Sequence, residues 1–242
     1  FAGHGQFAVC PGIFALMKKP FSTDAPHPTR RQTLVGGLLV ALASPFALTA
    51  CGRKKPRAQA IAADATVLAL GDSLTAGVGA APDAAYPVVL QRLTGWKVVN
   101  AGVSGDTSAQ ALARLPALLQ THAPALVILS IGGNDFLRRQ SADATRAQVR
   151  QICSEALAGG AQVLLVAVPE LSIMAAAGRL SDHPLYEEIA SALKIPLHRN
   201  GWSGVLADEK LRADQVHANA SGYALFTEGL VATLRESGLL AT

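Results

Sequence analysis

The stretch that decides the fold of this chain is TVLALGDS, residues 66–73. A short run of apolar and β-branched residues ends at Gly71, and an aspartate and a serine follow it. A continuous apolar run of this length is typical of a strand that is buried on both faces of a parallel sheet. Ser73 would then lie just beyond the carboxyl end of that strand.

The pattern of an apolar run followed by small and polar residues recurs along the chain. It predicts further strands over residues 97–100, 125–131, 162–168 and 195–197. Apolar periodicity and capping residues predict helices over residues 86–93, 108–121, 143–157 and from Asn219 or Ser221 to about 235. Pro116 lies inside the second of these helices, where we expect it to cause a break or a new helix start.

Strands that alternate with helices predict an α/β domain in which both faces of a parallel sheet are covered. About five strands suit a flavodoxin-like, three-layer α/β/α arrangement over residues 65–242. In such folds the active site lies beyond the carboxyl ends of the strands. Glycine-containing polar loops follow the first three predicted strands, at residues 71–73, 102–106 and 132–135. We therefore expect these loops to meet at one edge of the sheet.

The composition suits a domain with a large apolar core, since 50% of the residues are hydrophobic and 16% are charged. That balance excludes an intrinsically disordered chain. The net charge is +4, but four basic residues and one acidic residue before Cys51 account for three of these charges. The rest of the chain has no basic patch interleaved with aromatic residues, so we expect no nucleic-acid partner. The three cysteines do not form a disulfide framework.

Residues 1–50 have the layout of a leader with an export signal. Arg30 and Arg31 precede a mostly apolar run over residues 34–50, which closes with small residues. The run is shorter than the ~20 residues that a membrane-spanning helix needs, and Pro45 interrupts it. A membrane helix that is retained in the mature protein is the alternative interpretation.

The end of this segment, Leu48-Thr49-Ala50-Cys51, resembles a bacterial lipobox. The resemblance implies that Cys51 is lipidated and that the protein is exported to the periplasm and anchored to a membrane, with Gly52 favouring the outer membrane. Several acyl chains anchor a protein stably, because each buried CH₂ contributes roughly 0.8 kcal/mol. Residues 51–64 would then form a flexible tether. Residues 29–34 also resemble a twin-arginine signal, so two export routes remain open.

Ser73 is the candidate nucleophile, because its position at the sheet edge near a helix start would expose its hydroxyl. The alternative is an ordinary capping or turn serine. A serine nucleophile needs a base. His217 has Asp214 three residues earlier in a loop, and this spacing lets the carboxylate hold the ring nitrogen that faces away from the serine. His183 is the alternative base, but its side chain and that of the adjacent Asp182 diverge.

Two loops offer donors for the oxyanion that forms when a serine attacks an ester carbonyl. The loop of residues 102–106 offers backbone N–H groups, and Asn134 offers a side-chain amide after two glycines. Each loop, taken alone, is also an ordinary turn sequence. The chain has no G-x-S-x-G sequence, which argues against the nucleophile elbow of an α/β-hydrolase.

Four blocks together resemble, in order and spacing, the motifs of the SGNH hydrolase superfamily, also called the GDSL family. They are Gly71-Asp72-Ser73-Leu74, Gly105, Gly132-Gly133-Asn134-Asp135 and Asp214-Gln215-Val216-His217. The resemblance covers residues 66–237, and residues 100–119 are similar to the periplasmic thioesterase/lysophospholipase and arylesterase branch. One departure is Ala218, where the family often has proline; we expect it to change the mobility of the loop but not the mechanism.

The resemblance assigns roles to these residues. Ser73 would be the nucleophile, and Asp214 and His217 would complete a Ser-His-Asp triad. The backbone N–H groups of Ser73 and Gly105 and the side-chain amide of Asn134 would form the oxyanion hole.

These roles imply a serine esterase that hydrolyses carboxylic esters or thioesters through an acyl-enzyme, of arylesterase, acyl-thioesterase or lysophospholipase type. Its partner would be a small acyl ester or thioester, and no cofactor, metal or obligate protein partner is implied. Two alternatives remain open: a carbohydrate acetylesterase, and a non-catalytic lipidated protein that binds envelope components. Residues 173–175 are candidates for an acyl groove or a packed lid.

Overall fold

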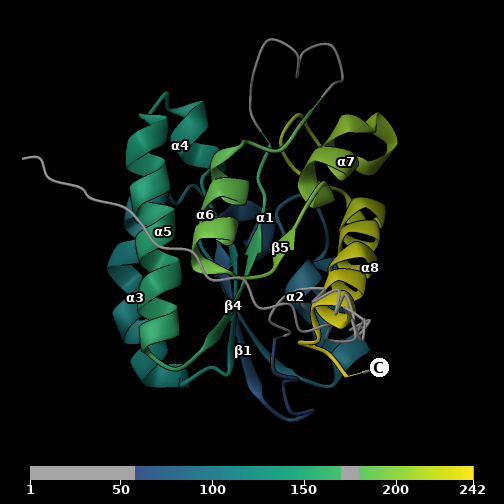
Figure 1. The fold of residues 1–242 in the computed structure, drawn as a ribbon. Helices are drawn as coiled ribbons and strands as arrows, with labels where there is room; N and C mark the ends of the chain where they lie inside the picture. The colour runs from purple at the N-terminus through teal and green to yellow at the C-terminus, as the bar shows by residue number, and fades with distance from the viewer. Residues whose placement is uncertain (1–57, 170–179, 242) are drawn as a thin grey trace, which may run out of the picture. The chain divides into compact units, whose positions relative to one another are not determined.

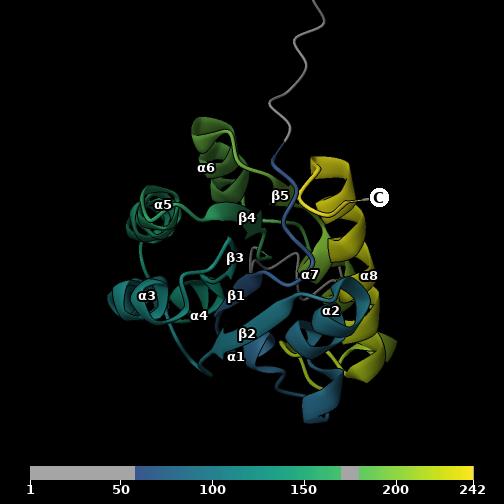
Figure 2. The same ribbon diagram turned by 90° about the horizontal axis from the view of Figure 1, so that it is seen from below.

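Five parallel strands form the central sheet (Figure 1), and Figure 2 shows their spatial order, β2-β1-β3-β4-β5. They are β1 (Thr66–Gly71), β2 (Lys97–Gly102), β3 (Leu126–Ser130), β4 (Gln162–Val166) and β5 (Leu197–His198). The structure, a computed structural model, describes residues 58–169 and 180–241, which belong to the second of two units of the chain, residues 52–242. The predicted α/β fold with a parallel sheet of about five strands is confirmed.

Helices cover both faces of the sheet (Figure 2). One face packs against α3 (Ser108–His122), α5 (Ala142–Ala158) and α6 (Leu185–Leu193). The other packs against α2 (Tyr86–Thr94), α7 (Gly201–Ala207) and α8 (Ala220–Ser237). Short helices α1 (Ser73–Ala76), η1 (Pro82–Ala84), α4 (Gly133–Leu137) and η3 (Glu209–Leu211) lie in the connections. Within the described residues, no helix has both the length and the apolar character that crossing a membrane requires.

The strand β1, which lies between β2 and β3, shows why the apolar runs are continuous. Val67 and Ala69 belong to the core on the α8 side of the sheet, whereas Leu68 and Leu70 belong to the core on the α3 side. All four side chains are fully buried. A strand that is covered on both faces needs an apolar residue at every position, and burying each valine or leucine contributes about 1.5–3 kcal/mol.

The helix α3 continues through Pro116, so the predicted break is wrong. At its start, Thr107 and Gln110 form a capping box in which each side chain bonds to the backbone of the other residue. Leu115 is fully buried on the inner side of the helix, whereas Pro116 is exposed. Capping and packing against the sheet therefore outweigh the ~3 kcal/mol that a proline costs inside a helix.

Residues 58–64 were predicted as the end of the tether, but they pack against the domain. The N–H of Ala58 donates to the carbonyl of Ser237 (3.1 Å), and that of Ile61 donates to the carbonyl of Leu239 (2.8 Å). The Ile61 side chain belongs to the core on the α8 side. The folded part of the chain thus includes these residues, while Cys51 lies outside the described residues.

Candidate active site

Ser73, His217 and Asp214 form one hydrogen-bonded chain. The Oγ of Ser73 lies 2.9 Å from Nε2 of His217, and Nδ1 of the same ring lies 2.7 Å from Oδ2 of Asp214. The fold thus brings Ser73, the second residue after β1, next to the loop before α8. In this geometry the imidazole can take the proton of the serine while the carboxylate holds the opposite ring nitrogen.

The loop that carries Asp214 is held by its own backbone. Oδ1 of Asp214 accepts hydrogen bonds from the N–H groups of Val216 and His217, both at 2.8 Å. Desolvation opposes ionisation of Asp214, but the hydrogen bonds from the His217 ring and from these two N–H groups outweigh it and lower the pKa of the carboxyl. Asp214 is therefore kept in the charged form that orients an imidazole ring.

Asp72 places Ser73 in the first turn of α1. Its Oδ1 accepts a hydrogen bond from the N–H of Leu74 (3.1 Å), which caps the helix. Asp72 is 3% exposed, and this burial raises the pKa of its carboxyl to about 6, although the bond from Leu74 and the nearby His217 act in the opposite direction. Before it, a Cβ at Gly71 would lie 2.3 Å from the carbonyl oxygen of Ser130, so only glycine fits between β1 and β3.

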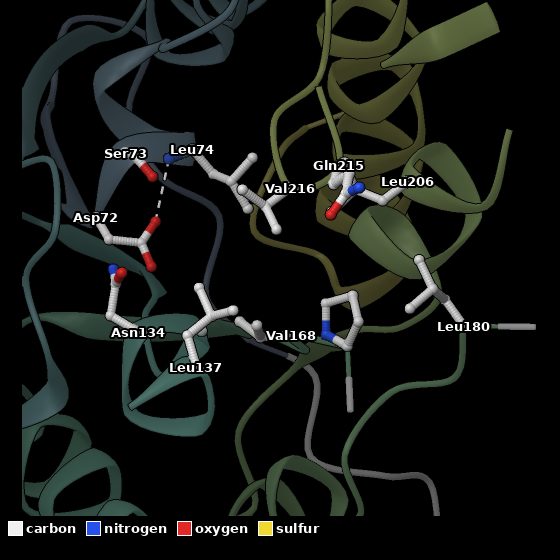
Figure 3. A pocket seen from close by; sticks show the side chains of 12 residues that line it. Asp72, Ser73, Leu74, Asn134, Leu137, Val168, Leu180, Leu206, Gln215 and Val216 are labelled. Atoms are coloured by element: carbon white, nitrogen blue, oxygen red, sulfur yellow. Dashed lines mark hydrogen bonds between the residues drawn. The ribbon is translucent and has the colours of Figure 1, made fainter. Parts of the chain in front are cut away.

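Gly105 lies in the loop that follows β2, and Asn134 lies in the short helix α4 that follows β3. Gly105 has a φ of +84°, in the left-handed region that glycine adopts without strain. Nδ2 of Asn134 donates to the backbone carbonyl of Asp106 (3.0 Å), which joins the two segments directly. Asn134 and Ser73 line the same cleft (Figure 3).

Asp135 provides a second connection between these segments. Its carboxylate is fully buried and accepts hydrogen bonds from the N–H (2.9 Å) and the hydroxyl (2.5 Å) of Ser108, at the start of α3. A buried carboxylate without such donors would be strongly destabilising. Asp135 therefore has a structural role, in which it holds the start of α3 against the short helix α4 that follows β3. In the sequence, Asp135 is part of a motif, but no role of its own was predicted for it.

An open cleft begins at Ser73. Its polar lining is Asp72, Ser73, Asn134 and Gln215, and most of the rest is apolar: Leu74, Leu137, Val168, Pro169, Leu180, Leu206 and Val216. In Figure 3, Leu180 and Leu206 lie at the end away from Ser73. The cleft therefore suits a molecule with one polar reacting group and an apolar chain. Residues 173–175, the predicted acyl groove, lie outside the described residues.

His183, the alternative base, and His198 have other contacts. Nδ1 of His183 accepts a hydrogen bond from the N–H of Leu185, and its ring stacks on Phe136 with the centroids 4.6 Å apart. His198 is buried beside Thr233 (2.8 Å), and burial lowers its pKa to about 4. In the described parts of the chain, no group of three or more His, Cys, Asp or Glu residues is arranged to hold a metal ion.

Comparisons with known proteins place this geometry in context. The family model described as GDSL-like Lipase/Acylhydrolase matches residues 69–225. The chain is 39% identical over 167 residues to the "Thioesterase 1/protease 1/lysophospholipase L1" of Escherichia coli (strain K12), over 66% of this chain and 78% of that protein. It is 32% identical over 182 residues to the "Esterase TesA" of Pseudomonas aeruginosa, over 72% of this chain and 90% of that protein. A crystal structure of TesA matches with a TM-score of 0.63 and 32% identity, over 71% of this chain and 99% of that chain.

Proposed function

Because the chain belongs to the GDSL-like lipase/acylhydrolase family and is a carboxylic ester hydrolase, we propose that it cleaves esters and thioesters of apolar acyl chains by a Ser-His-Asp triad. The observation that carries this proposal is the hydrogen-bonded chain from Asp214 through His217 to Ser73. A serine hydroxyl is a weak nucleophile until an adjacent base takes its proton.

In the first step, Oγ of Ser73 attacks the carbonyl carbon of the substrate and Nε2 of His217 takes the hydroxyl proton. The charge that develops on the carbonyl oxygen is held by the N–H groups of Ser73 and Gly105 and by the amide of Asn134. An asparagine amide has two N–H bonds. One of them donates to Asp106 in the structure, which leaves the second for the oxyanion.

In the second half of the reaction, His217 gives its proton to the leaving alcohol or thiol as the bond to the acyl carbon breaks. A water molecule then attacks the acyl-enzyme and gives a proton to His217. His217 passes this proton to Oγ of Ser73 as the bond between Oγ and the acyl carbon breaks, and the carboxylic acid is released. Asp214 stays ionised throughout and stabilises the imidazolium that forms in both halves.

The cleft supports an acyl chain longer than acetyl. An acetyl group would leave most of the apolar lining in contact with water, whereas a longer chain would bury it. The name of the Escherichia coli relative includes thioesterase and lysophospholipase activities, which supports the same substrate class. These observations favour this function over the two alternatives, the acetylesterase and the non-catalytic binding protein.

The test is the hydrolysis of p-nitrophenyl esters from acetate to palmitate by the full chain and by its Ser73→Ala variant. We expect the variant to lose at least about 10⁴-fold in kcat, and the wild type to prefer chains longer than acetate. A wild type active on acetate alone would indicate the acetylesterase. Equal activity of the two proteins would show that Ser73 is not the nucleophile, and no activity in either would favour the binding protein.

We also propose that the protein is exported to the periplasm and anchored to a membrane through lipidated Cys51, on the resemblance of residues 48–51 to a lipobox. Partition of the expressed protein between detergent and aqueous phases tests this. The wild type should enter the detergent phase and a Cys51→Ser variant should not. Equal partition of the two proteins would contradict the anchor, and it would leave the esterase proposal untouched.

A further inference from the structure

The side chain of Arg114 lies behind the oxyanion hole. It projects from α3, and its Nε donates to Oδ2 of Asp106 (2.7 Å) while its Nη2 donates to the carbonyl of Gly71 (2.9 Å). Gly71 is two residues before Ser73, and Asp106 directly follows Gly105. A planar guanidinium can hold both acceptors in one fixed geometry. Arg114 therefore ties the end of β1 to the loop after β2.

The same connection extends to the loop after β3. The backbone carbonyl of Asp106, whose side chain binds Arg114, accepts the hydrogen bond from Nδ2 of Asn134. One series of contacts thus runs from Gly71 through Arg114 and Asp106 to Asn134. The three groups assigned to the oxyanion hole all lie on residues that belong to this series or are within two positions of it.

The ion pair also differs from the other arginine–carboxylate pairs of the described residues. Its acid, Asp106, has a side chain that is 9% exposed, whereas the carboxylates in the other pairs are 52–88% exposed. Exposed ion pairs contribute little to stability because water and salt screen them. A shielded pair with two directed hydrogen bonds instead holds its partners in defined positions.

We propose that Arg114 is a positioning residue for catalysis, which sets the spacing between Ser73 and the oxyanion donors Gly105 and Asn134. This inference rests on the proposed function. Arg114 itself touches no reacting atom. The hydrogen bonds that it aligns become strong only when the carbonyl oxygen acquires charge, so misalignment weakens binding of the transition state more than binding of the substrate. The effect therefore falls on kcat and not on KM.

A double-mutant cycle tests the proposal. Arg114→Gln should lower kcat by ~10- to 100-fold and change KM by less than about threefold, a smaller loss than that of a whole oxyanion donor. In an Asn134→Ala background the same substitution should cost less than about fivefold, because the main donor that Arg114 positions is already absent. A purely structural role for Arg114 would instead give the same factor in both backgrounds.

Two further variants test the same contacts independently of Arg114→Gln, and a third serves as the control. Asp106→Asn removes the charge but keeps the backbone carbonyl that binds Asn134, and it should reproduce the kcat loss even if Arg114→Gln folds poorly. Arg114→Lys should rescue part of the activity, since a lysine cannot bond both acceptors in one plane. The control is Arg92→Gln, because Arg92 also donates to a backbone carbonyl, that of Asp83 (3.1 Å), but lies exposed on α2.

The outcomes separate the two proposals. Equal losses with and without Asn134, or a change in KM with kcat intact, would overturn the role of Arg114, while the inactivity of Ser73→Ala would leave the proposed function standing. Full activity of Ser73→Ala would overturn both. A loss of kcat that is confined to backgrounds with Asn134, with Arg92→Gln at the wild-type level, is the expected result.

Discussion

The active site has two sides that are built differently. The strand-end side comprises the loops after β1, β2 and β3, and its acids Asp72, Asp106 and Asp135 are all buried. Hydrogen bonds across this side join residues 27 to 43 positions apart. The base loop, residues 212–219, carries Asp214, whose side chain is 53% exposed and which bonds residues at most three positions away.

Because the two sides are built differently, we expect substitutions on them to affect stability and catalysis differently. The strand-end side is joined by hydrogen bonds between residues that lie far apart in the sequence, so a substitution there changes the stability of the fold as well as the positions of the proposed oxyanion donors. The base loop is shaped by local hydrogen bonds at the surface, so a change there should affect the reaction and leave the fold intact. Each of the following substitutions tests one half of this contrast.

The largest expected effect is that of Asp214→Asn in the base loop. An asparagine neither holds the productive tautomer of His217 nor stabilises its charged form, so kcat should fall by about 10³–10⁴-fold. The free energy of unfolding should change by less than about 1 kcal/mol, because the side chain is exposed. Asp208→Asn is the control, since Asp208 also accepts a backbone hydrogen bond, from Lys210, but lies outside the site. A decrease in the free energy of unfolding well above about 1 kcal/mol would contradict the proposed difference between the base loop and the strand-end side.

The next effect is that of Asn134→Ala on the strand-end side. Removal of an oxyanion donor should lower kcat by ~10²–10³-fold, with a small change in KM. The loss of its bond to Asp106 should also lower the melting temperature, unlike Asp214→Asn. Steady-state kinetics and thermal unfolding on the same preparations measure both. Unchanged kcat would show that Asn134 does not bind the oxyanion.

Asp72→Asn should stabilise the protein in a pH-dependent way. The folded-state pKa of about 6 lies above the ordinary value of 3.8, so the native state binds the proton more tightly than the unfolded state. The free energy of unfolding of the wild type should therefore decrease as the pH rises from 4 to 6. Asparagine removes this penalty, and its advantage should reach about 3 kcal/mol at most near pH 8 and shrink towards zero near pH 4. Urea unfolding at the two pH values checks this; an advantage independent of pH would refute the assignment.

The smallest effect is that of Ser108→Ala, which removes one hydrogen bond to the buried Asp135. It should lower the free energy of unfolding by about 1–2 kcal/mol, since a buried acceptor loses a donor. Ser154→Ala is the matched control, because the Ser154 hydroxyl donates to the carbonyl of Arg150 on an exposed part of α5. Equal stability of the two variants would mean that Asp135 does not depend on Ser108.

Local signals account for what the sequence predicts well. Strands such as β3 are apolar at their first four positions because both faces are covered, and parallel strands place their carboxyl ends at one edge. The approach of Asp214 to His217 follows from a spacing of three residues. The helix α6 was not predicted, although Leu185, Ile189 and Leu193 recur at helical spacing within it.

Other features have no local signal. The helix α7 is seven residues long and contains two glycines, and it is held by Trp202, whose ring stacks on Phe226 of α8 with the centroids 3.6 Å apart. The contact of Arg114 with Gly71 spans 43 positions. It depends on how α3 packs against the sheet, which no periodicity of the sequence specifies.

The most direct test of the triad is covalent labelling with an organophosphonate, followed by mass spectrometry of the intact protein and of its peptides. The account predicts one adduct per chain, on Ser73, which is absent in Ser73→Ala and forms much more slowly in Asp214→Asn. An adduct on another residue, or no adduct in a preparation that hydrolyses esters, would contradict the assignment of Ser73, His217 and Asp214 as the catalytic triad.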